Sequence, residues 1–444
     1  MKTIFENASL ILPGHQTGKG DVLVENGRIA EIRMAGPDAA KGGAGTDAVR
    51  VDCTGKLLMP GLVNCHGHTA MTLVRGVGGG LPLQRWLEEA IFPIEAKMTP
   101  EDVAAGTTWG AMEMLAGGTT CVADMYDFPD VYDVRLAEAG LKASVNRVGL
   151  AFSDNVPPGR LDECVAYVAR GCTDKINRDF CIHSEYLTNE KFCRELAAAN
   201  RDYRRPVHVH VSETEKEHAE CLARHGKTPI AYLADTGLLD YGAYAAHCVY
   251  VTDDDFRIMR EKNVTLVHNP SSNMKLGSGF ARISAALAAG VNVALGTDGC
   301  ASNDNLDMFE EMHLASLIHK GLANDPTALS AWDVIEMATK NGAKALGMDD
   351  TGEIAVGKKA DLCVVDLDRF HLMPCLDIPN LIVNSMHASD VMMTIVDGRV
   401  VYEKSKSEVE VVQWNGQDSI VGLPTTTRTE FLAAVKRIGL ESLT

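Results

Sequence analysis

An alternation of short apolar strands with helical stretches runs from Pro60 to Thr297, and this feature constrains the fold most. Helical segments fit every gap between the strands, and one of them is predicted to begin at Thr99 as N-cap, with Pro100 at its first position, and to end at Gly117-Gly118. Such strand–helix units form parallel sheets, and eight of them predict an α/β protein with a closed (β/α)8 TIM barrel. The chemistry of this fold stands at the carboxyl ends of its strands. The eight strands centre on residues 62–66, 120–124, 143–149, 180–184, 207–211, 243–248, 264–268 and 291–297.

Both ends of the chain carry β-hairpin signals. Asn26-Gly27 lies within alternating apolar and polar residues, and Asp397-Gly398 turns a second strand pair after a further strand at 360–366. Neither end has enough strands to be stable alone, so we expect the two ends to pair as one small β domain. Residues 35–49, rich in Gly and Ala, predict a loop. The predicted domains are 1–59 and 356–424 for the two parts of the β domain, 60–355 for the barrel and 425–444 for a terminal helix.

Composition narrows the class of partner. The formal net charge of -18 argues against nucleic acid and anionic membranes, which bind clustered Lys and Arg, and favours a small molecule. No apolar run is long enough to span a membrane, and Glu6 comes too early for a signal peptide. The twelve cysteines contain no Cys-x-x-Cys pair and suit a reducing compartment. We therefore expect a cytoplasmic protein.

Two histidines one residue apart, His66 and His68, end the first barrel strand. Alternate side chains of a strand share a face, so both rings face the same way, and neutral imidazole is a common ligand of transition metals. Together with one histidine of strand five and Asp298, they would give an ion three nitrogens and a carboxylate, with room for a water. The other strand ends that carry such groups contribute His208, His210, Glu213, His247 and His268.

With these motifs the sequence resembles the amidohydrolase superfamily, and within it the 5-methylthioadenosine/S-adenosylhomocysteine deaminases. The resemblance implies a distorted barrel with a β-sandwich built from both ends. It also implies one divalent ion held by His66, His68, His210 and Asp298, zinc above all, although Fe2+ or Mn2+ would suit these ligands. The motifs that carry it are Pro60-Gly61-Leu62-Val63-Asn64, His66-Gly67-His68, Leu81-Pro82-Leu83, Trp86-Leu87, Pro93-Ile94-Glu95, His268-Asn269-Pro270-Ser271-Ser272-Asn273-Met274-Lys275-Leu276, Gly296-Thr297-Asp298-Gly299, Ser302-Asn303, Leu306-Asp307-Met308 and Gly357-Lys358-Lys359-Ala360-Asp361-Leu362.

The family motif also separates the two histidines of strand five. Its ligand stands three residues before a catalytic glutamate, which fits His210 and Glu213 and leaves His208 as a hydrogen-bonded core residue. Binuclear relatives need a lysine at the end of strand four, and residues 181–185 contain none, so a single ion is expected. Relatives carry acidic residues where this chain has Gly78-Gly79-Gly80, which leaves the conformation of that loop open.

By the same resemblance, the ion lowers the pKa of a water to about 7 so that it attacks the carbon that bears an exocyclic amine. Glu213 carries a proton from this water to the ring nitrogen. His247 orients the water and stabilises the tetrahedral intermediate, and Asp298 passes the second proton to departing ammonia.

Substrate contacts follow from matching motifs. Glu95 would accept hydrogen bonds from ribose hydroxyls, His183 would meet the purine edge and Trp86 would wall the pocket. Arg147 and Arg160 would hold the amino-acid carboxylate of S-adenosylhomocysteine.

The leading hypothesis is therefore a hydrolytic deaminase that converts the adenine of S-adenosylhomocysteine, 5′-methylthioadenosine or a related adenosine to hypoxanthine. The alternatives are a deaminase of a free base of the guanine or cytosine type, an s-triazine hydrolase of the same superfamily, and a scaffold without activity. Glu95 with Arg147 favours a nucleoside, since a free base has no ribose or carboxylate. The complete set of ligands argues against the scaffold, and a homo-oligomer is left open.

Overall fold

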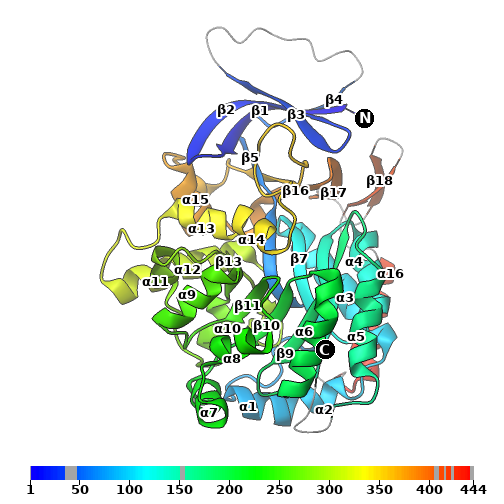
Figure 1. The fold of residues 1–444 in the computed structure, drawn as a ribbon. Helices are drawn as coiled ribbons and strands as arrows, with labels where there is room; N and C mark the ends of the chain where they lie inside the picture. The colour runs from blue at the N-terminus through cyan, green and yellow to red at the C-terminus, as the bar shows by residue number, and fades with distance from the viewer. Residues whose placement is uncertain are drawn as a thin grey trace.

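The computed structural model describes residues 2–35, 48–150, 156–404, 410–414, 417–421 and 425–440, so the loop predicted at 35–49 lies mostly outside the described residues. A barrel surrounded by helices forms the larger body in Figure 1. A sheet built from the two ends of the chain lies against one end of the barrel, and the helices α1 (Leu83–Arg85), α2 (Phe92–Glu95) and α7 (Glu215–His225) lie at the other.

The eight predicted strands form one parallel sheet, which confirms the predicted fold class. Strand eight is split: its first part, β13, pairs with β12, and its last part, β14, pairs with β6, where Asp298 lies beside Gly67. Between the two parts Gly296 passes so close to β6 that a Cβ atom there would lie 2.7 Å from the backbone nitrogen of His66. The sheet thus closes on itself, with a distortion at Asp298. Its strands are β6 (Leu62–His68), β7 (Thr119–Tyr126), β8 (Lys142–Arg147), β9 (Ile176–Ser184), β10 (Val207–Val211), β11 (Ala243–His247), β12 (Val264–His268), β13 (Val293–Leu295) and β14 (Asp298–Gly299).

Helices cover the outside of this sheet (Figure 1). The first of them begins where the sequence predicts: the Thr99 and Asp102 side chains each bond the other's backbone amide, and the helix ends at Gly117. The long helices are α3 (Pro100–Ala116), α4 (Pro129–Ala139), α5 (Arg160–Ala169), α6 (Glu190–Tyr203), α7 (Glu215–His225), α8 (Pro229–Thr236), α9 (Asp253–Glu261) and α12 (Met308–Ala323). Shorter ones are α11 (Ile283–Ala288), α13 (Ala331–Met337), α14 (Lys340–Ala345) and α15 (Ile378–Asn384).

Both ends of the chain contribute to one ten-stranded mixed sheet, as predicted. The two halves meet where β5 runs antiparallel to β15, with Leu58 opposite Val364, and side chains of both halves share one apolar core. The domain boundaries themselves stay predictions. The strands are β1 (Lys2–Leu12), β2 (Gln16–Glu25), β3 (Arg28–Met34), β4 (Val49–Asp52) and β5 (Lys56–Pro60), then β15 (Leu362–Asp366), β16 (Val391–Val396), β17 (Arg399–Glu403), β18 (Glu410–Trp414) and β19 (Gln417–Val421).

Both predicted hairpin turns are present. Asn26 and Gly27 have φ of 51° and 79°, and Asp397 and Gly398 have φ of 49° and 72°. Positive φ at both central residues is the requirement of a type I′ turn, which Asn-Gly and Asp-Gly meet at low cost.

The ends of the chain are attached to the barrel at several points, among them a buried ion-pair cluster and a helix–helix contact. Lys142, at the start of β8, is buried with its Nζ 2.6 Å from both Asp361 and Asp397 of the terminal sheet. Helix α16 (Thr425–Arg437) packs on α3, where the Phe431 ring stacks on Trp109 with centroids 4.4 Å apart. Among the described helices, none combines the length and apolar character that crossing a membrane requires.

Candidate metal centre and its pocket

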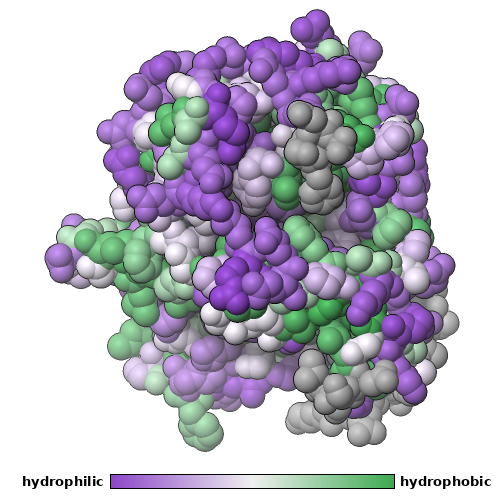
Figure 2. Space-filling view, turned by 90° about the horizontal axis from the view of Figure 1, so that it is seen from below, coloured by the Kyte–Doolittle hydropathy of each residue, from purple (hydrophilic) through white to green (hydrophobic). Residues whose placement is uncertain are grey.

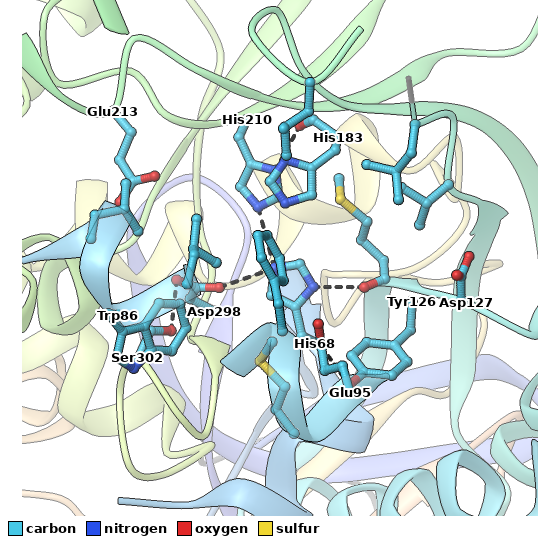
Figure 3. A pocket seen from close by; sticks show the side chains of 18 of the residues that line it. His68, Trp86, Glu95, Tyr126, Asp127, His183, His210, Glu213, Asp298 and Ser302 are labelled. Atoms are coloured by element: carbon cyan, nitrogen blue, oxygen red, sulfur yellow. Dashed lines mark hydrogen bonds and ion pairs between the residues drawn. The ribbon is translucent and has the colours of Figure 1, made fainter. Parts of the chain in front are cut away.

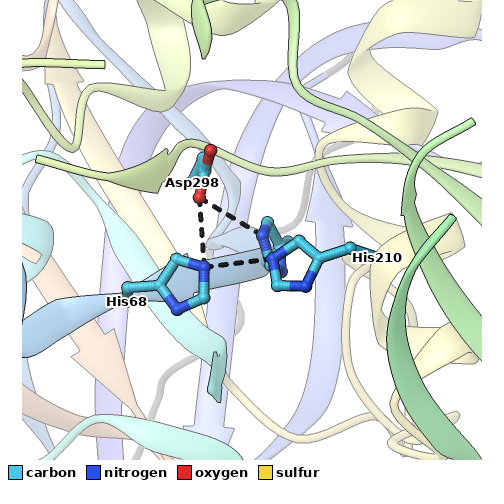
Figure 4. A group of neighbouring side chains, drawn as sticks. His68, His210 and Asp298 are labelled. Atoms are coloured by element: carbon cyan, nitrogen blue, oxygen red, sulfur yellow. Dashed lines mark hydrogen bonds and ion pairs between the residues drawn. The ribbon is translucent and has the colours of Figure 1, made fainter. Parts of the chain in front are cut away.

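Four of the predicted ligands meet at the carboxyl end of the barrel. His66 and His68 come from β6, His210 from β10 and Asp298 from β14, and one donor atom of each lies within 4.8 Å of the others. Oδ1 of Asp298 is 3.3 Å from Nε2 of both His66 and His68. Figure 4 shows His68, His210 and Asp298 pointing at one another.

The local pattern of β10 explains how its histidine reaches the centre. Val207, Val209 and Val211 belong to the main apolar core, where residues of α8 also pack. Because side chains alternate along a strand, His208 and His210 turn to the opposite side, into the barrel.

The orientation of the rings fits a bound cation. Nδ1 of His68 lies 2.6 Å from the Met125 carbonyl and Nδ1 of His210 lies 2.7 Å from the His183 carbonyl. A carbonyl only accepts, so each neutral ring carries its hydrogen on Nδ1 and turns an unprotonated Nε2 inward. These two Nε2 atoms are 3.2 Å apart, and the buried Nε2 of His66 makes no hydrogen bond. Three nitrogen lone pairs and a carboxylate therefore converge on one point, as a divalent ion requires.

Charge within the cluster is distributed unevenly. Burial alone would raise the pKa of Asp298, but the adjacent His66 and His68 rings hold it well below its usual range. Burial lowers the pKa of His66 to about 4, whereas Asp298 raises the pKa of His68 to about 9 against the effect of burial. Without an ion, one proton on His68 thus balances the carboxylate, in the position where a cation would do so.

His208 lies one layer below the ligands. Its Nε2 is 2.8 Å from Nδ1 of His66, it is fully buried, and its ring packs on Tyr244 with centroids 4.4 Å apart. The structure therefore places His208 as a support of the His66 ring and places His210 among the four converging groups.

Two further groups with predicted roles in the reaction stand beside the cluster: Glu213, the predicted carrier of the first proton, and His247, predicted to orient the water. Oε2 of Glu213 lies 3.8 Å from Nε2 of His247, and both residues are buried. Burial raises the pKa of Glu213, although the Ser278 hydroxyl, which donates to its Oε1 at 3.0 Å, acts in the opposite direction. Nδ1 of His247 is 2.9 Å from Oδ1 of Asn273, which leaves Nε2 free to face the pocket.

A pocket of about 370 Å³ opens from the cluster, a volume in the range of small-molecule sites. Figure 3 shows Glu95 and Tyr126 on the His68 side of it, where the Tyr126 hydroxyl donates to Glu95 at 2.7 Å. Burial raises the pKa of Glu95. The predicted residues that line the pocket are His68, Trp86, Glu95, His183, His210, Glu213, His247 and Asp298.

The loop whose conformation the sequence left open packs against the pocket wall. Gly78 has φ of 75°, and a Cβ atom there would lie 2.7 Å from the Trp86 ring. The Trp86 indole nitrogen donates to the Val77 carbonyl at 3.2 Å. Trp86 begins a π-helical segment, η2 (Trp86–Ile91), that leads through α2 (Phe92–Glu95) to Glu95. Glycine is therefore required at position 78 both for the backbone and for the close approach of the indole.

The pocket end of the barrel, seen from below in Figure 2, is mainly hydrophilic with hydrophobic patches between.

Among the predicted substrate contacts, Arg147 and Arg160 are the two that do not line the pocket. Nη1 of each lies within 3.1 Å of Oδ1 of Asp127, at 2.7 Å for Arg147. Arg147 also donates to Glu163. Both guanidinium groups are therefore occupied by acidic side chains of the chain itself.

Several polar side chains of the site were not predicted from the sequence to have a role there. Ser272 and Ser302 both donate to Oδ2 of Asp298, at 2.6 and 2.8 Å, and so fix which oxygen faces the histidines. The Tyr126 hydroxyl likewise donates to Glu95, and the Ser278 hydroxyl donates to Glu213. Oδ1 of Asn273 accepts from Nδ1 of His247. Serines, an asparagine and a tyrosine are common everywhere, so nothing in their spacing distinguishes them. Ser272, Asn273 and Ser302 lie within the sequence motifs shared with the amidohydrolase superfamily, and this position was the one feature of the sequence that indicated a role at the site.

Comparison with known proteins agrees with this geometry. Residues 57–401 match the model of the amidohydrolase family. The chain is 43% identical to a 5-methylthioadenosine/S-adenosylhomocysteine deaminase of Acetivibrio thermocellus over 80% of this chain and 83% of that protein. It is 42% identical to a 5′-deoxyadenosine deaminase of Methanosarcina mazei over 90% and 92% of the two chains.

Solved structures show the same fold. The crystal structure of an adenosine deaminase from Xanthomonas campestris with bound zinc superposes with a TM-score of 0.89, at 33% identity over 98% of both chains. A zinc complex of atrazine chlorohydrolase from Arthrobacter aurescens gives a TM-score of 0.84 at 21% identity, over 98% of this chain and 100% of that one. The second likeness concerns the fold alone.

Proposed function

Because the chain belongs to the amidohydrolase family, we propose that it is a hydrolytic deaminase that converts the adenine of a 5′-substituted adenosine to hypoxanthine and releases ammonia. One observation carries this proposal: three imidazole nitrogens and the Asp298 carboxylate converge at the base of a pocket that Glu213 and His247 also line. The relatives named as deaminases of such nucleosides support the choice of substrate, since the similarity extends over most of each chain.

A single divalent ion, zinc by preference, would be held by His66, His68, His210 and Asp298. When bound, it would supply the Lewis acidity that activates water at neutral pH. Its donor set of three imidazoles and a carboxylate also admits iron or manganese.

Protein groups would then move the protons. Glu213, whose pKa is raised by burial, would take a proton from the attacking water and give it to the ring nitrogen. His247, fixed through Nδ1 by Asn273, would present Nε2 to the water and to the charge that develops at the reacting carbon. Asp298 would pass the second proton to the leaving ammonia.

The pocket would hold the nucleoside by groups at its sides. Glu95, oriented by the Tyr126 hydroxyl, would accept hydrogen bonds from the ribose. His183 would meet the purine edge, and its pKa, lowered to about 3 by burial and by the adjacent His68, keeps the ring neutral. Trp86 would close one wall. A free base or an s-triazine would leave Glu95 buried without a ligand partner, which favours the nucleoside.

We also propose a cytoplasmic location. All twelve cysteines are unpaired, which suits a reducing compartment.

The test is an ammonia-release assay with metal analysis. The zinc-loaded protein should deaminate adenosine, 5′-deoxyadenosine or 5′-methylthioadenosine and leave guanine and cytosine intact, with one metal ion per chain. Glu213→Gln should keep the metal and lose roughly a hundredfold or more in turnover. Glu215→Gln, an exposed position on the same segment, is the matched control. Two ions per active chain, activity on bases alone, or full activity of Glu213→Gln would each contradict the proposal.

A further inference from the structure

A small cluster of charges stands behind one wall of the pocket. Arg147 donates to Asp127 through Nη1 at 2.7 Å and to Glu163 through Nε and Nη2 at 3.0 and 2.7 Å. Arg160 donates through Nη1 to Asp127 at 3.1 Å and to the Val148 carbonyl at 3.0 Å. The two cations are therefore balanced by two carboxylates, and both arginine side chains are largely buried.

Asp127 is the member of this cluster that lines the pocket (Figure 3). It directly follows Tyr126, whose hydroxyl holds Glu95, so it stands next to the group proposed to bind the ribose. Among the described residues beside it, Phe128, Val148 and Leu150 are apolar. Of the described residues, this side of the pocket thus presents a carboxylate among apolar side chains, with the guanidinium groups behind it.

We propose that Asp127 sets the specificity of the pocket for the 5′ substituent, an inference that rests on the proposed deaminase function. It keeps Arg147 and Arg160 paired and repels a carboxylate on the substrate, whereas a neutral or cationic 5′ substituent meets no like charge. A substrate carboxylate would have to displace Asp127 from two charge-assisted hydrogen bonds before either arginine could bind it.

The measurement is kcat/KM for 5′-deoxyadenosine, for S-adenosylhomocysteine and for the decarboxylated form of S-adenosylhomocysteine, which keeps the ammonium group and lacks the carboxylate. The wild type should prefer the decarboxylated form over S-adenosylhomocysteine by about tenfold or more. In Asp127→Asn the ratio of S-adenosylhomocysteine to 5′-deoxyadenosine should rise by about tenfold, because the neutral amide oxygen binds the two guanidinium groups more weakly and no longer repels a carboxylate.

Glu163→Gln is the matched control, since Glu163 binds the same Arg147 but does not line the pocket. It should change the ratio by less than about threefold. A wild type that prefers S-adenosylhomocysteine to its decarboxylated form overturns the proposal, even if every variant fails to fold. So does an unchanged ratio in Asp127→Asn or in Asp127→Ser. A wild type that deaminates no nucleoside contradicts the proposed function instead, so the two failures are distinguishable.

Discussion

Replacing His208 by phenylalanine tests whether the layer below the ligands sustains metal binding. With an ion on Nε2 of His66, the ring hydrogen of His66 sits on Nδ1, and Nε2 of His208 at 2.8 Å is placed to accept it. Phenylalanine fills the space against Tyr244 but leaves a buried N–H unpaired, which costs about 1 to 3 kcal/mol. At 1.4 kcal/mol per tenfold, the metal Kd should rise about 5- to 140-fold, which brackets the usual effect of losing such a support.

Competition with a fluorescent chelator at pH 7 measures this Kd. Tyr244→Phe is the control, because its hydroxyl bonds Ser144 and Asp179 in the same layer and does not touch a ligand. It should lower the thermal midpoint and leave the Kd unchanged. An unchanged Kd in His208→Phe would refute the supporting role. Complete loss of binding, as expected for His210→Ala, would instead make His208 a ligand.

Two further predictions concern stability. Lys142→Met should lower the free energy of unfolding by about 3 kcal/mol or more, because it leaves the buried Asp361 without its cation. Lys359→Met, which removes a partly exposed lysine 3.8 Å from Asp397, should cost less than about 1 kcal/mol, and similar urea midpoints for the two variants would contradict this account. In metal-free protein the pKa of His68 is raised from 6.5 to about 9, so its stabilising contribution is complete below pH 6.5 and is lost as the pH rises to 9. The thermal midpoints of zinc-loaded and metal-free protein should therefore diverge over this interval, and a constant gap would argue against a charged His68. Burial raises the pKa values of Glu217 and Glu311 to about 8. Both groups titrate in both forms of the protein, so their contributions to the difference between the two thermal midpoints cancel.

The regular part of the fold could be predicted because it depends on local patterns. The alternation of side chains along the strands, the helix cap at Thr99 and the two turns that contain Gly each depend on a few neighbouring residues. All of them have the expected structure. The break in strand eight could not be predicted in this way. Residues 291–297 read as one mostly apolar strand, and only the approach of Gly296 to β6 shows where pairing changes from β12 to β6.

The candidate site likewise contains groups that could be predicted from the sequence and groups that could not. The candidate ligands could be narrowed to a few because His, Glu and Asp at strand ends are few, whereas the choice of His210 and the role of Glu213 rested on the family resemblance. The partners of Arg147 and Arg160 could not, because Asp127 lies 20 and 33 residues from them in the chain and no period links these positions. The arginines were predicted to hold a carboxylate of the substrate, and that role stays a prediction beside the pairing with Asp127.

The pairing of β5 with β15 also orders events during synthesis. Strand β5 leaves the ribosome before the barrel and β15 after it, so the edge of β5 that pairs with β15 has no partner strand until the whole barrel has been synthesised. Closing so long a loop is costly for an unfolded chain, but a folded barrel brings the two strands together and removes most of that cost. We therefore expect the nascent barrel to form first and to serve as the template on which the terminal sheet is completed.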